Sequence, residues 1–314
     1  MSARNLKQRR AGAVKHYVNC SISRSTIRAY AADLSHFRAW GGKIPSSPEQ
    51  LARYLAEQAQ RLKISTLKRH VAAIASAHHA RTLPSPSTSP LVKNTLRGIG
   101  RAHGCQQKQA HPLLPAMLRE LIKECKTFSN AQNTRDRALL LVGFSGGFRR
   151  SELCALRVSD LSFTNDGLLI RLRSGKTDQY SLGRDVAIPA AGKSKHCPVK
   201  AVAAWLKLLR SEFPSGDPRV LPLFNGIDKH GHIRAGMHPA TVGSILRRRM
   251  LACNMSVEGF SAHSLRAGLV TSAAQAGVPL WVIQKQTGHK SHVTVQRYIR
   301  NLQPFECNAA LALL

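Results

Sequence analysis

The most informative stretch of the sequence reads Gly147-Phe148-Arg149-Arg150-Ser151-Glu152-Leu153. It predicts a turn followed by a helix whose first positions hold two arginines. Glu152 comes about one helical turn after Arg149, so its carboxylate can orient that guanidinium. Taken alone, such a pair is more typical of a solvated helix start than of a catalytic site.

Three further segments carry residue types suited to phosphodiester chemistry. Lys176 lies on a polar connection between two strand-like runs. His263 and Arg266 are three residues apart, which places both on one face of a helix. Gly288-His289 ends a short helix, and Tyr298 follows nine residues after that histidine. Each segment alone also fits an ordinary surface or packing role.

The charge of the chain indicates a polyanionic partner. The sequence holds 47 Lys and Arg against 16 Asp and Glu, a formal net charge of +31 at pH 7. Nucleic acid is the default partner for such a surplus. The acids are scattered singly and suit no pair of metal ions, so a cationic pocket without a metal, nucleotide or other cofactor is the favoured chemistry.

An arm and a helical unit are predicted for the first third of the chain. Residues 1–20 are basic and lack the apolar core of a secretory signal, so we interpret them as a flexible arm of a cytoplasmic protein. Residues 21–107 show helical spacing, with starts at Ser25-Thr26 and at Ser47-Pro48-Glu49. The proline-rich residues 83–90 are expected to be non-helical.

The remaining residues, 108–314, are predicted to be mostly helical around a small antiparallel sheet. The sheet is expected from Leu168 to Leu172 and from Asp185 to Pro189. Helical spacing is present before the sheet and returns beyond Lys200. The longest stretch without charge, Ala267 to Gln284, is interrupted by polar residues, glycine and proline and would span a bilayer poorly.

Other motifs are weaker. Gly143-Phe144-Ser145-Gly146-Gly147 matches the pattern of a serine hydrolase, and Leu139 to Val142 could supply the strand that this pattern requires. Arg247-Arg248-Arg249 is expected to contact phosphates or to form a wet helix face. The seven cysteines have no metal or disulfide spacing and are expected to be reduced.

The order and spacing of the four segments together resemble the tyrosine recombinase, or phage integrase, family. In that family an arginine precedes a small residue, Glu and Leu, and a hairpin lysine, His-x-x-Arg, Gly-His and a tyrosine follow. The resemblance runs from about Pro115 to Tyr298, and the helical unit looks like the family's core-binding domain. Arg173 to Gln179 and Ala262 to Arg300 look closest to the Cre-like simple recombinases.

The resemblance implies a clamp around duplex DNA and a covalent mechanism. Tyr298 would form a 3′-phosphotyrosine, and Lys176 would protonate the 5′-oxygen. Arg149, Arg266 and His289 would hold the non-bridging oxygens of the phosphate. His263 would act as acid or base near Tyr298, and Glu152 would orient the pocket. A four-way junction and a tetramer on paired DNA sites are also implied, with the apolar tail 308–314 docking on a neighbouring protomer or on its own domain.

The sequence departs from the family pattern at two places, and it leaves alternative functions open. Arg150 occupies a position that is usually apolar, although the Ser-Glu-Leu sequence favours Arg149 as the catalytic arginine. Ala267-Gly268 replaces the more frequent His-Thr, which is expected to affect packing. An idle DNA-binding protein on the same scaffold and a type IB topoisomerase are the alternatives, besides the hydrolase.

Overall fold

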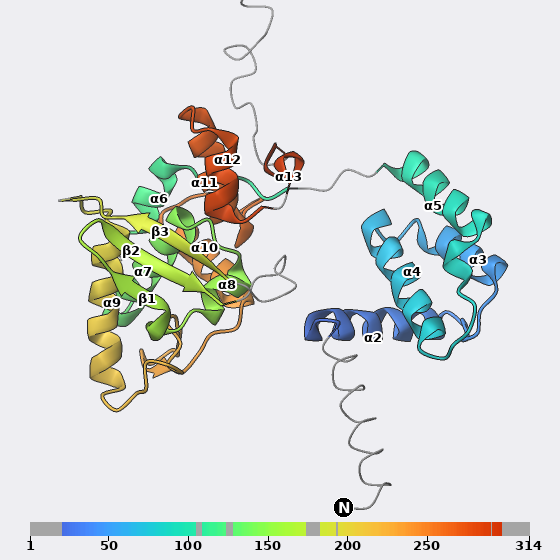
Figure 1. Ribbon diagram of the computed structural model, residues 1–314, viewed down its shortest axis with the longest axis horizontal. Coiled ribbons are helices and arrows are strands. Elements are labelled where there is room, and N and C mark those ends of the chain that lie inside the picture. The colour runs from blue at the N-terminus through green and yellow to red at the C-terminus, as the bar shows by residue number, and fades with distance from the viewer. Residues whose placement is uncertain are drawn as a thin grey trace, which may run out of the picture. The chain divides into compact units, whose positions relative to one another are not determined.

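The protein is described by a computed structural model that covers residues 21–104, 109–123, 128–173, 183–192, 194–289 and 291–296. The chain divides into two compact units, Met1–Gln107 and Lys108–Leu314 (Figure 1). Each unit has its own hydrophobic core. That the first unit binds DNA and the second unit is catalytic stays a prediction.

The described part of the first unit is all helical, as the apolar spacing predicts. Its elements are α2 (Arg24–Ala39), α3 (Pro48–Gln58), α4 (Ile64–His79), the short 3-10 helix η1 (Pro86–Thr88) and α5 (Pro90–His103). Ser47 caps α3 by accepting a hydrogen bond from the Gln50 amide, and Pro48 follows at the first helical position. The prediction was wrong in two details, because Ser23 caps α2 and because residues 83–90 contain η1.

A partly buried chain of polar side chains connects three helices of this unit. The hydroxyl of Tyr54 on α3 is 2.8 Å from Nδ1 of His36 and 2.6 Å from Nδ1 of His70. Nε2 of His70 is 3.0 Å from Asp33, which also accepts two hydrogen bonds from Arg69. Burial, followed by the negative charge of Asp33, raises the pKa of Tyr54 to about 12. The chain therefore satisfies the polar groups that α2, α3 and α4 bury.

The described part of the second unit is mostly helical around a small three-stranded sheet, which confirms the predicted fold class. The helices follow in the order α6 (Pro115–Leu121), α7 (Asn130–Ser145), α8 (Arg150–Ala155), η2 (Val158–Asp160), α9 (Pro198–Glu212), α10 (Ala240–Ala252), α11 (His263–Gln275), α12 (Leu280–Thr287) and α13 (His292–Gln296). Helix α7 lies beside α9 and α11. Eight of its sixteen residues are buried, so it forms the centre of the unit.

The sheet is antiparallel in the order β1 (Leu161–Phe163), β2 (Gly167–Leu172) and β3 (Arg184–Pro189). Leu172 pairs with Arg184, so the predicted connection that carries Lys176 joins the paired ends of β2 and β3. Burial alternates along both strands, with Leu168, Ile170, Val186 and Ile188 buried. Strand β1 and the two-residue strands β4 (Gly226–Ile227) and β5 (Ile233–Arg234) were not predicted, because they are too short to show alternation.

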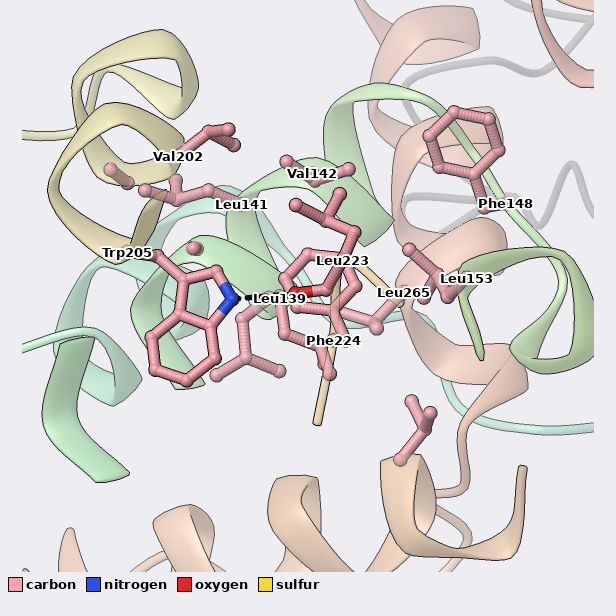
Figure 2. Packing of buried hydrophobic residues seen from close by; sticks show 14 of the residues in the cluster. Leu139, Leu141, Val142, Phe148, Leu153, Val202, Trp205, Leu223, Phe224 and Leu265 are labelled. Carbon is pink, nitrogen blue, oxygen red and sulfur yellow. Dashed lines mark hydrogen bonds between the residues drawn. The ribbon is translucent and has the colours of Figure 1, made fainter. Parts of the chain in front are cut away.

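The core of the second unit packs the helices against the inner face of the sheet. Figure 2 shows Trp205 of α9 among Leu139, Leu223 and Phe224. Its indole Nε1 donates to the carbonyl oxygen of Leu223 at 2.6 Å. The largest side chain of the core therefore keeps its polar atom satisfied while it is fully buried.

The serine hydrolase interpretation requires a strand before Ser145, and this strand is not present among the described residues. Leu139 to Val142 lie in the interior of α7, and Ser145 is the last residue of that helix. A nucleophile elbow needs a strand before the serine. The four apolar residues are helical because they face the core on all sides of α7, and such a run does not distinguish a strand from a buried helix.

The prediction for the three consecutive arginines was wrong for Arg249. Its side chain is buried and donates to Asp136 at 2.9 Å and to the side-chain oxygen of Asn133 at 2.9 Å. Arg248 also donates to Asp136, at 3.2 Å, while Arg247 is exposed. A buried aspartate on α7 therefore makes Arg249 a structural residue.

The described ranges also bear on membrane insertion, metal binding and the state of the cysteines. No helix within them is both long and apolar enough to cross a membrane. The same residues contain no group of three or more His, Cys, Asp or Glu side chains that could hold a metal ion. Cys154, Cys197 and Cys253 lie in these ranges, and none of the three is in a disulfide bond.

Candidate active site

Helix α8 positions the first arginine of the candidate site. Arg149 precedes the helix with extended backbone, and Glu152 follows within the first turn. One oxygen of the Glu152 carboxylate accepts from the Arg149 side chain at 2.6 Å, and the other accepts from the Arg149 amide at 2.8 Å. Glu152 is buried, whereas Arg150 is exposed. The local pairing that the sequence indicates is therefore present and holds Arg149.

Helix α11 brings the second arginine to the same place. Arg266 is 1% exposed and donates to the carbonyl oxygen of Gly147 at 2.6 Å. Gly147 has a φ of +57°, and a Cβ there would lie 2.8 Å from side-chain atoms of Leu269 and Thr287. A glycine is therefore required at this turn, both for its left-handed backbone and for the close packing around it.

His289 completes a directed chain of hydrogen bonds. Arg266 donates from Nη2 to Nε2 of His289 at 2.8 Å, and Nδ1 of His289 lies 2.6 Å from the hydroxyl of Thr287. That hydroxyl donates to the carbonyl oxygen of Ile283 at 2.6 Å. Since a guanidinium can only donate, Nε2 accepts and Nδ1 carries the proton. The imidazole is therefore neutral in this arrangement.

The surroundings of His289 also oppose its protonation. Burial, followed by the positive charges of Arg266, Arg149 and Arg184, lowers the pKa of His289 to about 3. Both causes disfavour the imidazolium form, since a buried cation would lose its hydration and would face three like charges. At neutral pH this side chain is therefore uncharged.

Arg184 also belongs to the cluster, although it was not predicted as a site residue from the sequence. It donates to the carbonyl oxygens of Gln286 and Thr287, at 2.7 and 3.3 Å, and its Nη2 lies 3.9 Å from Glu152. Burial lowers the pKa of Arg184, against the opposing effect of Glu152. One signal could have found it, because alternation along β3 puts residue 184 on the same face as the buried Val186 and Ile188.

The other predicted residues are His263, on the described helix α11, and residues that fall outside the described ranges. His263 is the first residue of α11, one turn before Arg266, and it is exposed. Lys176, Tyr298 and the tail 308–314 fall outside the described residues. The structure therefore brings together Arg149, Glu152, Arg266 and His289 from three separate segments of the chain.

The cluster is suited to an oxyanion whose charge increases during a reaction. Arg149, Arg184 and Arg266 supply three positive charges against the one negative charge of Glu152. A phosphodiester carries one negative charge and gains a second when an oxygen nucleophile attacks its phosphorus atom. Guanidiniums that are already fixed in place stabilise such a state without reorganising.

Comparison with known proteins agrees with this geometry. Residues 112–303, which include the whole cluster, match the sequence profile of the phage integrase family. The chain belongs to this family. The family assignment made from the sequence is therefore confirmed, while the narrower likeness to the Cre-like simple recombinases stays a prediction.

Two relatives of this phage integrase family member match it over most of their length. The integrase/recombinase xerD homolog of Selenomonas ruminantium is 32% identical over 304 residues, which cover 94% of this chain and 87% of the relative. The recombinase Cre of Escherichia phage P1 is 26% identical over 307 residues, which cover 92% and 85% of the two chains.

The fold is also that of a site-specific recombinase of known structure. The XerH site-specific recombinase, bound to a palindromic difH substrate in a post-cleavage complex, superimposes with a TM-score of 0.64 at 22% identity. The match covers 87% of this chain and 75% of the XerH chain. The mostly helical architecture with a small sheet is therefore shared with that recombinase.

Proposed function

We propose that this phage integrase family member is a site-specific DNA recombinase that cuts and rejoins DNA through a 3′-phosphotyrosine intermediate. The observation that carries the proposal is the convergence of the Arg149–Glu152 pair, Arg184 and the Arg266–His289 pair in one cationic cluster. The net charge of +31 suits a DNA duplex. A DNA substrate also places the protein in the cytoplasm, in association with DNA.

In the proposed cleavage step the hydroxyl oxygen of Tyr298 forms a bond to phosphorus, and the bond from phosphorus to the 5′-oxygen breaks. A free tyrosine has a pKa near 10, so the hydroxyl needs a base or a cationic surrounding to react at neutral pH. His263 takes its proton, and Lys176 gives one to the departing 5′-oxygen.

The cluster stabilises the charge that builds on the non-bridging oxygens during this step. Arg149 and Arg266 do so directly, and Glu152 keeps Arg149 in place. His289, which is neutral and hydrogen-bonded to Arg266, contributes by orienting that guanidinium. The reaction requires no metal or other cofactor.

Strand exchange follows when a 5′-hydroxyl of a second duplex attacks the phosphotyrosine and releases Tyr298. Two such exchanges through a four-way junction recombine two sites. Four protomers on paired sites would carry them out, with the tail 308–314 linking neighbours. Deleting these residues is then expected to leave cleavage of a single site intact and to impair assembly on two sites, measured by gel shift.

The decisive experiment traps the covalent intermediate. A nicked suicide DNA loses a short fragment after cleavage, so a covalent adduct accumulates and resists denaturation. Wild-type protein is expected to form the adduct, Tyr298→Phe is expected to form none, and Ser145→Ala is expected to match the wild type. An adduct that survives the phenylalanine substitution would show that another side chain is the nucleophile.

Two further measurements separate the alternative functions. An idle DNA-binding protein would bind the DNA and form no adduct in any variant. A type IB topoisomerase would relax supercoiled plasmid that lacks paired sites, and it would act as a monomer. DNA affinity is expected to fall steeply with salt, because each neutralised phosphate releases condensed counterions.

A further inference from the structure

Strand β3 and helix α12 are joined by hydrogen bonds that run in both directions. The side chain of Arg184, the first residue of β3, donates to the carbonyl oxygens of Gln286 and Thr287. In the opposite direction, Nε2 of Gln286 donates to the carbonyl oxygen of Ala187 on β3 at 3.2 Å and to that of Ser145 at 3.0 Å. We call the side chains of Arg184 and Gln286 with these four carbonyl acceptors the β3–α12 latch.

The latch acts at the end of a helix, where backbone groups lack partners. The last carbonyl groups of a helix have no intrahelical donor, and a cation next to them is favoured by the helix dipole. Helix α12 ends at Thr287, and its C-cap residue, Gly288, has a φ of +66°. A Cβ at this position would lie 2.7 Å from Nε of Arg184, so the guanidinium lies directly against Gly288. The next residue is His289.

The same guanidinium also reaches the other half of the site. Its Nη2 is 3.9 Å from the Oε2 atom of Glu152, and that oxygen accepts the hydrogen bond from the Arg149 amide. Only about a quarter of the Arg184 side chain is exposed. Arg184 therefore lies between the Arg149–Glu152 pair and the turn that carries His289.

From these contacts we infer that Arg184 is a positioning residue, which together with Gln286 holds the His289 turn at the correct distance from the Arg149–Glu152 pair. The inference rests on the proposed function, and it assigns Arg184 no contact with the reacting atoms. Two of its nitrogens are already bonded to backbone carbonyl groups. A displacement of about 1 Å in a reacting group can slow an enzymatic step by about 100-fold.

Single-turnover cleavage of the nicked suicide DNA at saturating concentration tests the inference. Arg184→Gln is expected to cleave about 100-fold more slowly than the wild type, because the carbonyl groups before His289 lose two donors. Arg184→Lys keeps the charge but not the planar fork, so it is expected to stay slow. Gln286→Met changes no charge and removes the other half of the latch, with an expected loss of about 10-fold.

The matched control is Arg171→Gln. Arg171 lies on the neighbouring strand β2, on the exposed face of the sheet, and pairs with Asp185. This variant removes one positive charge close to Arg184 and leaves the latch intact. Its cleavage rate at saturating DNA is expected to equal that of the wild type, which separates the loss of the latch from the loss of charge near the DNA.

A second measurement follows His289 directly. In an NMR titration of the intact protein, Arg184→Gln is expected to raise the pKa of His289, because one of the cations that lower it has been removed. Gln286→Met is expected to change the ring's chemical environment with little change in that pKa. A general loss of packing would not produce this difference between the two variants.

The outcomes are distinguishable. If wild-type protein forms no adduct, the proposed function is wrong and the rates do not apply. If wild-type protein cleaves, and both Arg184→Gln and Gln286→Met cleave as fast as the wild type, the inference is wrong. It is also wrong if Arg184→Lys and Gln286→Met both cleave at the wild-type rate, because Arg184 would then act by its charge. Should Arg184→Gln not fold, Gln286→Met alone decides the question.

Discussion

Arg266 and His289 form a buried pair in which the arginine is the donor and the imidazole the acceptor, with 2.8 Å between Nη2 and Nε2. Arg266 lies on α11, and His289 follows the end of α12, 23 residues later in the chain. Its direction follows from the donors of arginine alone. Because Nε2 must be unprotonated to accept this hydrogen bond, the contact with Arg266 favours the neutral form of His289.

His289 is therefore expected to remain neutral far into the acid range. Its pKa of about 3 lies below the value near 6.5 that it has in the unfolded chain. Between these pH values the unfolded state binds one more proton than the folded state. The contribution of His289 to the free energy of unfolding is therefore fully present above about pH 6.5, and it is lost as the pH falls toward the folded-state pKa. The slope is at most about 1.4 kcal/mol per pH unit. An NMR titration that gives a pKa near 6.5 would contradict the enclosed arrangement.

Glu152→Gln is expected to destabilise the protein and to slow cleavage. The substitution keeps the size of the side chain but leaves Arg149 and Arg184 without their shared carboxylate. Removing one partner of a fully buried pair costs about 3–5 kcal/mol, and about 2 kcal/mol is expected here because both arginines keep some contact with water. Urea unfolding measures the loss.

The control for this substitution is Glu120→Gln. Glu120 pairs with Lys123 on the surface, with both side chains largely exposed. Removing that pair is expected to change the free energy of unfolding by less than about 1 kcal/mol. Equal losses for the two variants would contradict a special role of Glu152 in holding the arginines.

Two helical glycines are expected to respond to alanine in opposite directions. A Cβ at Gly268 of α11 would collide with the backbone carbonyl oxygen of Leu113, so Gly268→Ala should destabilise by about 1–3 kcal/mol. Gly98 of α5 has nothing within 4 Å of such a Cβ, and Gly98→Ala should stabilise by about 0.5–1 kcal/mol. Thermal unfolding of both variants checks the signs, and a stable Gly268→Ala would refute the close approach.

Arg249→Met and Arg247→Met are expected to separate structure from DNA binding. Arg249 is buried on Asp136, and its loss should cost about 3–5 kcal/mol. Arg247 is exposed, so its replacement should change stability by about 0.5 kcal/mol at most. If Arg247 contacts a phosphate, its variant should instead bind DNA with a smaller dependence on salt. Urea unfolding and salt titrations measure the two effects.

Much of the fold and half of the site follow from local sequence. The helix start at Ser47-Pro48-Glu49 was predictable because a cap, a proline at the first position and an early acid act within one turn. The pairing of Arg149 with Glu152 was predictable for the same reason, since the two residues are three apart. Strand β1, with three residues, was too short to show a pattern.

The family could be identified from the order of the arginines, the histidines and the tyrosine along the chain, because this order can be read from the sequence without any knowledge of contacts. Only the tertiary structure showed that Arg184 belongs to the cluster, that Arg249 is structural and that His289 is neutral. Burial and charge depend on groups far away in sequence, such as Asp136 for Arg249 and Arg266 for His289. A residue's type and local spacing determine which contacts it can make, and the packed chain decides which of them form.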